Sequence, residues 1–257
     1  MSDSNNTNND TPAAPRGLNI EALKAHVIAH KIDVCLWTIR ILTILFTIGY
    51  FVPLIGTSQN AYYKALIANA ATSALRLHQR MGGFSLSREL IARLLTEDSC
   101  HYLLYSLIFL YVTPVTWVLI PIVLFAVLHA SSYALTLLDA LGQNCWWGAR
   151  LLISLVEFQS RNILRAASLA EIIMMPYTVI LIFMGRAGLL TPFIYYHFLM
   201  QRYVSRRNPY TRNMFRELRD LVEHIGRHRS TPAFVTKILN HGITFVCKLA
   251  PQPQPQQ

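Results

Sequence analysis

The chain has 257 residues, of which 53% are hydrophobic and only 14% are charged. Ordinary soluble domains carry about 25% charged residues, so this composition excludes disorder over most of the chain and disfavours a soluble enzyme. Basic residues outnumber acidic residues by 23 to 13, and four cysteines are scattered without pairable spacing. We therefore expect a membrane protein that is not built on a disulfide framework.

Residues 1–30 are predicted to form a polar, disordered tail. The first part of this tail is rich in Asn and Thr and ends at Pro12, Pro15 and Gly17, a composition that cannot build a core. No cleavable signal peptide is expected, because the first apolar stretch begins too late and runs too long for one. Asn5 and Asn9 begin glycosylation sequons, which can be used only if this tail is lumenal.

The first membrane span is predicted to begin near Val34. Residues 41–63 contain no Asp, Glu, Lys or Arg, and about 20 apolar residues suffice to cross the hydrocarbon core. Arg40 is expected within this span or at its edge, where its long side chain can reach toward the lipid headgroups.

The second apolar region, residues 99–138, is forty residues long and carries no formal charge. As one helix it would measure about 60 Å, twice the roughly 30 Å of a bilayer core, so it must bend or break. Pro114 and Pro121 are the expected break points, because proline removes a backbone donor and clashes with the preceding turn. A break near Pro121 gives a hairpin of two spans, and the alternative is one span with an interfacial piece.

The third apolar region, residues 162–204, contains two runs that the sequence Gly-Arg-Ala-Gly separates at 185–188. Either a helical hairpin or one span followed by a shallow helix fits this pattern. We therefore predict an all-α, polytopic membrane protein with three to five hairpin-like crossings, whose membrane domain covers residues 31–204.

Glu171 is the one acidic residue well inside a predicted span. Acids within a membrane are costly and often functional, but Arg165 and Arg186 lie close enough in sequence to form a structural ion pair with it. A transporter usually shows more such groups and duplicated halves, and the sequence has no internal repeat.

Residues 61–98 are predicted to form amphipathic helices, because small and apolar residues recur near the helical period between Ala65 and Leu77. Gly82-Gly83 interrupts the pattern, and Ser85 can cap a second helix. These helices either pack on the spans or lie in the membrane interface, and both alternatives stay open.

The C-terminal region, residues 205–250, is predicted to be cytosolic, basic and helical, and residues 251–257 form a Pro/Gln tail. Ten of the 23 basic residues lie between Arg202 and Lys248, and the positive-inside rule places such a segment in the cytosol. Two amphipathic helices are expected here, and they suit an anionic lipid surface. A folded cap that packs on itself or on a partner is the alternative. The residues expected to contact lipid are Met214, Phe215, Leu218, Leu221, Phe234, Ile238, Phe245, Arg202, Arg206 and Arg207.

The search for catalytic chemistry finds little. The sequence lacks a Gly-rich phosphate loop, a Gly-x-Ser-x-Gly elbow and a His-Glu-x-x-His motif. Cys100 and His101 are adjacent and therefore point about 100° apart on a helix, which makes a poor dyad. We expect no enzyme, no metal and no cofactor. Arginines directly after a membrane segment suit lipid headgroups better than nucleic acid, so no nucleic-acid partner is expected.

Three segments resemble the transmembrane protein 33 family, which includes Krüppel homologue two and yeast pore-membrane proteins. They are residues 64–80 (KALIANAATSALRLHQR), residues 94–109 (LLTEDSCHYLLYSLIF), and residues 192–198 (PFIYYHF) through 205–210 (SRRNPY). The resemblance runs from about residue 30 to 250. The sequence is similar to an insect member of the family in particular.

This resemblance implies a non-enzymatic protein of the endoplasmic reticulum and nuclear envelope. It would organise the tubular reticulum alongside curvature-forming proteins, contribute to nuclear pore complex organisation with nucleoporins as partners, and affect unfolded-protein-response signalling. The family's membrane-binding C-terminal helix would correspond to the stretch that ends near Leu249. The alternative function is a channel or transporter subunit that affects calcium in the reticulum through Glu171.

Overall fold

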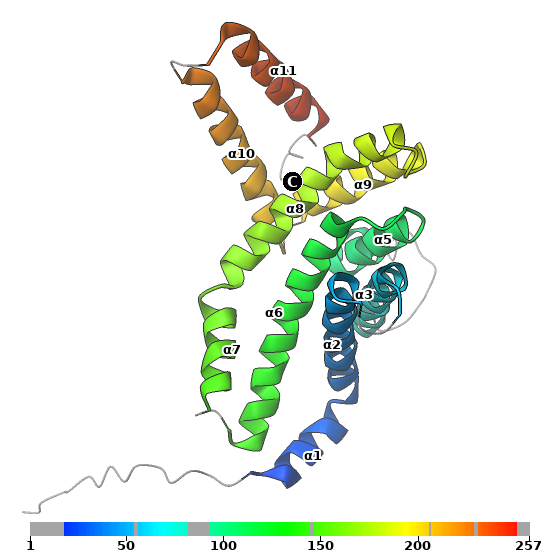
Figure 1. Ribbon diagram of the computed structural model, residues 1–257. Helices are drawn as coiled ribbons and strands as arrows, with labels where there is room; N and C mark the ends of the chain where they lie inside the picture. Colours follow the sequence, from blue (N-terminus) through cyan, green and yellow to red (C-terminus); the bar gives the residue numbers. More distant parts are fainter. Residues whose placement is uncertain are drawn as a thin grey trace, which may run out of the picture.

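The computed structural model describes residues 18–53, 56–81, 93–143, 146–205, 207–228 and 231–250. Within these ranges the regular structure is α-helical, which confirms the predicted fold class. The helices, shown in Figure 1, are α1 (Ile20–Ala29), α2 (Lys31–Phe51), α3 (Ser58–Met81), α5 (Asp98–Leu110), α6 (Thr116–Leu141), α7 (Trp147–Glu157), α8 (Ser160–Phe183), α9 (Leu190–Val204), α10 (Tyr210–Arg227) and α11 (Ala233–Leu249).

Three of these helices, α2, α6 and α8, are long and apolar enough to cross a membrane. They contain 21, 26 and 24 residues, and the mean hydropathy of their most apolar windows is 1.8, 2.1 and 1.9. At about 1.5 Å per residue, even the shortest reaches the roughly 30 Å of a hydrocarbon core. The chain is therefore a polytopic α-helical membrane protein, as predicted.

The first span begins three residues earlier than predicted and ends at Phe51. The uncharged stretch 41–63 is not one helix, because it is divided between α2 and the start of α3. Gly56, between the two helices, has a φ of 89°, a backbone conformation that glycine adopts without steric cost.

The second apolar region breaks at Pro114 and not at Pro121. Helix α5 ends at Leu110, and α6 begins at Thr116, two residues after Pro114. Pro121 lies inside α6 and is buried there, so the prediction of a break at this proline was wrong. It lies only five residues into the helix, where a missing amide costs a single hydrogen bond, and the helix continues through this buried position.

The third apolar region forms two helices around the predicted glycine-containing turn. Gly185 has a φ of 67° and separates α8 from the 15-residue α9. Of these two helices α8 alone is long enough to count as a span, and it takes in residues from Ser160 onward.

Turns join α2 to α3, α5 to α6 and α8 to α9, and these three turns meet at one end of the bundle. The Tyr50 hydroxyl lies 2.8 Å from the Thr116 hydroxyl and so joins the first turn to the second. Arg186 in the third turn donates from Nε to Thr113 Oγ1 and from Nη2 to the Pro114 carbonyl, each at 2.9 Å. We call the described residues 51–53, 56–57, 111–115 and 183–190 the turn end.

Each pair returns the chain to the opposite end of the bundle. There Gln79, near the end of α3, donates to Asp33, near the start of α2. Arg202, near the end of α9, contacts Asp98 at the start of α5. Helix α1 lies further still from the turn end, since the Asn19 amide donates to the Leu141 carbonyl at the end of α6.

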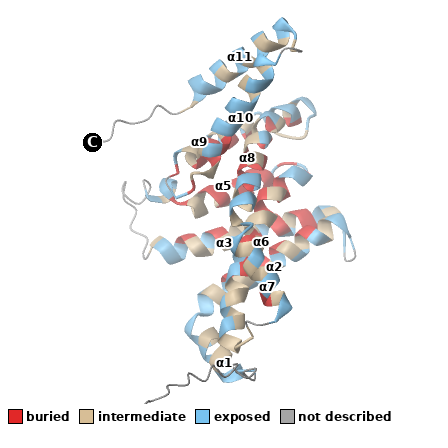
Figure 2. Cartoon of the chain, turned by 90° about the vertical axis from the view of Figure 1, so that its left-hand side faces the viewer, coloured by how far each residue is buried: buried red, intermediate tan, exposed pale blue. Residues whose placement is uncertain are grey.

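The core lies where α3, α5, α6, α8 and α9 meet, and Figure 2 shows the buried residues concentrated there. It is rich in aromatic side chains, which bury large areas and pack edge to face. Five of them have no exposed surface: Tyr62, Tyr105, Phe109, Tyr195 and Phe198. Helix α3 contributes its predicted stripe, including Ala65 and Leu77, to contacts with α2 and α5, so this helix packs on the spans. The predicted helix that Ser85 would cap falls largely outside the described residues.

Helices α10 and α11 form a separate arm that projects from the bundle at the top of Figure 1. Helix α10 packs on α8 and α9, and α11 packs on α10. The far end of α11 returns to the bundle, where the Tyr196 hydroxyl donates to the Leu249 carbonyl at 2.9 Å.

Candidate functional site

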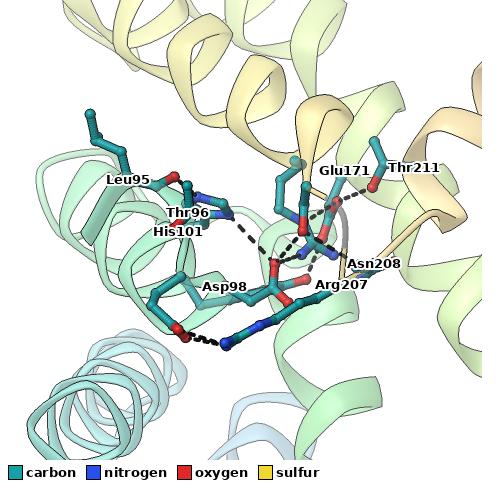
Figure 3. A network of polar contacts seen from close by, with 12 residues as sticks. Leu95, Thr96, Asp98, His101, Glu171, Arg207, Asn208 and Thr211 are labelled. Carbon is teal, nitrogen blue, oxygen red and sulfur yellow. Dashed lines mark hydrogen bonds and ion pairs between the residues drawn. The ribbon is translucent and has the colours of Figure 1, made fainter. Parts of the chain in front are cut away.

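A buried ion pair lies where α5, α8, α9 and α10 converge. Arg202 donates from Nε to Glu171 Oε2 at 3.2 Å and from Nη1 to Asp98 Oδ1 at 3.2 Å. Neither Glu171 nor Arg202 has exposed surface. Figure 3 shows Asp98, Glu171 and Thr211 directed toward a common centre. The pair therefore joins α8 to α9 through groups that water does not reach, and the partly exposed Asp98 extends the contact to α5.

Further hydrogen bonds occupy the Glu171 carboxylate. The Tyr102 hydroxyl donates to Oε1, and the Thr211 hydroxyl donates to Oε2 at 3.4 Å. The Tyr195 hydroxyl donates to the Glu171 backbone carbonyl at 2.7 Å. Because Thr211 lies in the first turn of α10, the same carboxylate also holds the arm to the bundle.

Arg202 also stacks on aromatic rings. Its guanidinium carbon lies 5.2 Å from the centroid of the Tyr102 ring and 5.9 Å from that of Phe125. A cation within about 6 Å of a ring face is attracted by the ring quadrupole, and the attraction grows when both groups are desolvated. Ion pairing and ring stacking together account for a fully buried arginine.

A second, more exposed cluster extends the network. Glu97 accepts from Arg80 of α3 and from Arg207 after α9, each at 2.7 Å. The Ser205 hydroxyl donates to Asp98 at 3.0 Å. These contacts fix the segment that leads from α9 into α10. The acids Glu97, Asp98 and Glu171 balance the arginines at 80, 202 and 207, so the network is electrically neutral.

The partner of Glu171 differs from the one expected. Arg165 pairs instead with Glu217 of α10 at 2.6 Å, on the surface, and Arg186 bonds within the turn end. Arg202 had been assigned to lipid headgroups because it follows an apolar run, and its burial removes it from that set. Sequence proximity favoured the wrong partners, since Arg202 lies 31 positions from Glu171 and approaches it only through the α8–α9 turn.

Arg40 lies near the middle of α2, which is a candidate span, and is 8% exposed. It is therefore not at the edge of the span, and its side chain does not extend to the bundle surface as a headgroup contact would require.

The predicted lipid-contacting face of α10 divides into two halves. Met214 is buried, and Phe215 packs against the core and lies 5.6 Å from the Tyr203 ring. Leu218 is half-buried, whereas Leu221 is 53% exposed. Only the later part of this face is open to another surface, because α8 and α9 cover the first turns.

Helix α11 keeps its predicted face exposed. Phe234, Ile238 and Phe245 recur at helical spacing and are 65%, 65% and 63% exposed. Arg207 is exposed over part of its side chain but is paired with Glu97, and Arg206 lies outside the described residues.

Exposed ion pairs stabilise α10 itself. Glu223 accepts from Arg219 and Arg227, one turn before and one turn after it, each at 2.8 Å. The hydrogen bond from Arg219 holds the pKa of the Glu223 carboxylate below its usual value.

A profile of the family described as "Transmembrane protein 33/Nucleoporin POM33" matches residues 14–252. The chain belongs to the transmembrane protein 33 family. It is 56% identical over 233 residues to Krueppel homolog 2 of Drosophila melanogaster, covering 91% of this chain and 84% of that protein. Human transmembrane protein 33 is 44% identical over 243 residues, 94% of this chain and 97% of that protein. The Caenorhabditis elegans homolog is 37% identical over 236 residues, 90% and 86% of the two chains. No solved structure matches the chain.

The transmembrane protein 33 family is a membrane protein family and is not a known enzyme family. In this member His101 is fully buried, its Nε2 lies 2.7 Å from the Leu95 carbonyl, and its Nδ1 lies 3.7 Å from Asp98 Oδ1. Across the described parts of the chain, His, Cys, Asp and Glu side chains form no group of three or more that could hold a metal ion.

Proposed function

We propose that this chain organises membranes of the endoplasmic reticulum and nuclear envelope, where it shapes the tubular network and contributes to nuclear pore complex organisation. The family description, which includes a nucleoporin, supports the location. The observation that carries the role is the exposed apolar face of α11, formed by Phe234, Ile238 and Phe245 on an arm attached to a multi-pass bundle.

The arm combines the two features that bind a helix to a lipid surface. Its apolar side chains are about two-thirds exposed, and burying such a side chain fully contributes about 1.5–3 kcal/mol. Within the arm, from Arg212 to Lys248, there are seven basic residues against three acids. Each basic residue near an anionic membrane contributes about 1 kcal/mol. A shallow helix on one leaflet expands that leaflet and so favours curvature.

The same charge asymmetry supports a cytosolic C-terminus, since basic segments beside spans stay in the cytosol. We propose anionic headgroups as the direct partners of the arm, and reticulum-shaping proteins and nucleoporins as its protein partners. Effects on unfolded-protein-response signalling then follow from altered membrane organisation.

The test changes the apolar face of α11 in the full-length chain, in cells that lack their own family member. Phe234→Asp, Ile238→Asp and Phe245→Asp together should abolish rescue of tubule branching and of nuclear pore distribution, because three charges on this face oppose insertion. The isolated tail, residues 207–250, should float with anionic vesicles, and the same triple variant should not.

A matched control places three new charges on the opposite, polar face of the same helix. Asn240→Asp, Thr244→Asp and Cys247→Asp add the same negative charge at exposed positions. They weaken the electrostatic attraction to anionic lipid as much as the first variant does, but they leave the apolar face intact, so rescue should be retained. If the apolar-face variant rescues as well as the control, lipid binding by α11 is not the basis of the function.

The alternative of a channel or transporter subunit depends on Glu171. In the structure this carboxylate is bonded to Arg202, Tyr102 and Thr211, which favours a structural role over ion conduction. Glu171→Gln in proteoliposomes should leave calcium flux at the background level of empty vesicles. A flux with the native chain that this substitution removes would support the alternative.

A further inference from the structure

The turn end presents exposed apolar side chains at the ends of the candidate spans. Tyr111, Phe183 and Leu189 are 90%, 87% and 81% exposed, and they come from the second and third turns. The first turn adds Phe51 and Val52 at 62% and 50%. Phe51 is the last residue of α2, and Phe183 the last of α8, so these exposed side chains lie directly at the ends of two candidate spans.

Charge is nearly excluded from the turn end. Among its described residues Arg186 is the one charged side chain, and its guanidinium donates to Thr113 and to the Pro114 carbonyl. The Arg186 carbonyl in turn accepts from the Thr113 amide at 3.4 Å. Polar groups of the second and third turns thus bond to each other, an arrangement that suits contact with lipid, where water does not satisfy them.

The opposite end of the bundle carries the charges. The network of Arg80, Glu97, Asp98, Arg202 and Arg207 lies there. The N-terminal end of the described chain lies beyond it, where the Asn19 amide donates to the Leu141 carbonyl. Helix α10 leaves the bundle from the same end, since Thr211 in its first turn bonds to Glu171. Each helix that contributes to the network separates it from the turn end by twelve residues. The intervals are Asp98 to Leu110 in α5, Glu171 to Phe183 in α8 and Arg202 back to Leu190 in α9. At about 1.5 Å per residue this is about 18 Å, more than half of a roughly 30 Å hydrocarbon core.

We propose that the turn end is a lipid-contacting surface, seated at the acyl-chain boundary of the leaflet opposite the termini. Each candidate span is followed or preceded by a return helix, so the number of passages is even and both termini lie on the same side. Counting only α2, α6 and α8 would give three passages and place the termini on opposite sides.

This inference deepens the proposed function and takes from it only the cytosolic side of the C-terminus. Helices α5 and α9 have 13 and 15 residues, about 20–22 Å, and helices shorter than the hydrocarbon core thin the bilayer around them. Local thinning beside a shallow arm is a second physical source of membrane deformation.

The test measures side and depth separately, in the full-length chain with its native cysteines replaced by serine. Single cysteines are introduced as Leu18→Cys near the N-terminus and Asp220→Cys at an exposed position of α10, and as Tyr111→Cys and Leu189→Cys at the turn end. The two turn positions are highly exposed, so these substitutions leave the core intact. To measure side, sealed reticulum vesicles with the cytosolic face outward are treated with a membrane-impermeant maleimide. To measure depth, purified protein is labelled with NBD at the single cysteine and reconstituted with doxyl-lipid quenchers.

We expect Leu18→Cys and Asp220→Cys to be labelled in sealed vesicles, and the two turn positions to be protected. NBD at positions 111 and 189 should be quenched several-fold more by doxyl lipids than by aqueous iodide. Labelling of Leu18→Cys only after permeabilisation, or glycosylation at Asn5 or Asn9, would overturn the even number of passages. Quenching at the turn positions by iodide alone would overturn the lipid contact. If the α11 variants do not affect rescue, the proposed function fails, but the expected labelling and quenching stay the same. The proposed function and the lipid contact of the turn end can therefore fail separately.

Discussion

Replacing Arg202 with methionine removes the charge that neutralises Glu171 and keeps most of the side-chain volume. Both groups are fully buried, so the substitution leaves a carboxylate without its counter-ion in a site that water does not reach. Breaking a buried pair in this way costs about 3–5 kcal/mol. For chains of about 150–250 residues 1 kcal/mol corresponds to roughly 2–4 °C, so the melting temperature should fall by about 6–20 °C.

The assay is thermal unfolding of the purified full-length protein in one detergent, followed by the loss of monodisperse protein on a sizing column. Arg165→Met is the control, because Arg165 and Glu217 form a pair whose side chains are 51% and 46% exposed. An exposed pair contributes about 0–1 kcal/mol, so the control should lose no more than about 4 °C.

A double variant separates the lost pair from general damage to packing. Glu171→Gln combined with Arg202→Met removes both charges, while Tyr102 can still donate to the amide oxygen. Replacing both members of a buried pair is often nearly neutral, so the double variant should recover most of the loss. Equal melting temperatures for Arg202→Met and Arg165→Met, or a double variant worse than either single change, would refute the reasoning.

Three further substitutions test the turns and the exposed cluster. Gly185→Ala places a side chain at a φ of 67°, and the strain of about 1 kcal/mol should lower the melting temperature by a few degrees without changing the fold. Glu97→Gln weakens the contacts to both Arg80 and Arg207, so limited proteolysis should cut between α9 and α10 faster than in the native chain. Pro121→Ala restores one backbone donor inside α6 and should raise or preserve the melting temperature; a drop of more than about 5 °C would show that the proline is required there.

Local sequence patterns predicted the elements of the fold well because helix formation in a membrane depends on local hydropathy. The uncharged stretches located the three apolar regions, and the glycines at 185 and 188 marked the third turn. The choice between Pro114 and Pro121 was not local. Pro121 lies inside α6 and is buried there, and its sequence neighbourhood does not reveal that burial.

The site was harder to predict than the fold. An amphipathic period shows that a helix has an apolar face, but it does not show what covers that face. Met214 and Leu221 lie on the same stripe, yet one packs on the bundle and the other is exposed. Arg202 ends an apolar run, as a headgroup-binding arginine does, and only the folding of α9 back along α8 brings it to Glu171.

The pairing of Glu171 with Arg202 has a consequence for how the protein is made. Glu171 leaves the ribosome 31 residues before Arg202, so α8 is synthesised while its carboxylate still lacks a counter-ion. Releasing α8 alone into lipid would expose that charge to hydrocarbon, at a cost of about 2.5–3.5 kcal/mol on an insertion scale. We expect the insertion machinery to retain α8 until α9 has emerged and to release the two helices together as a neutral pair.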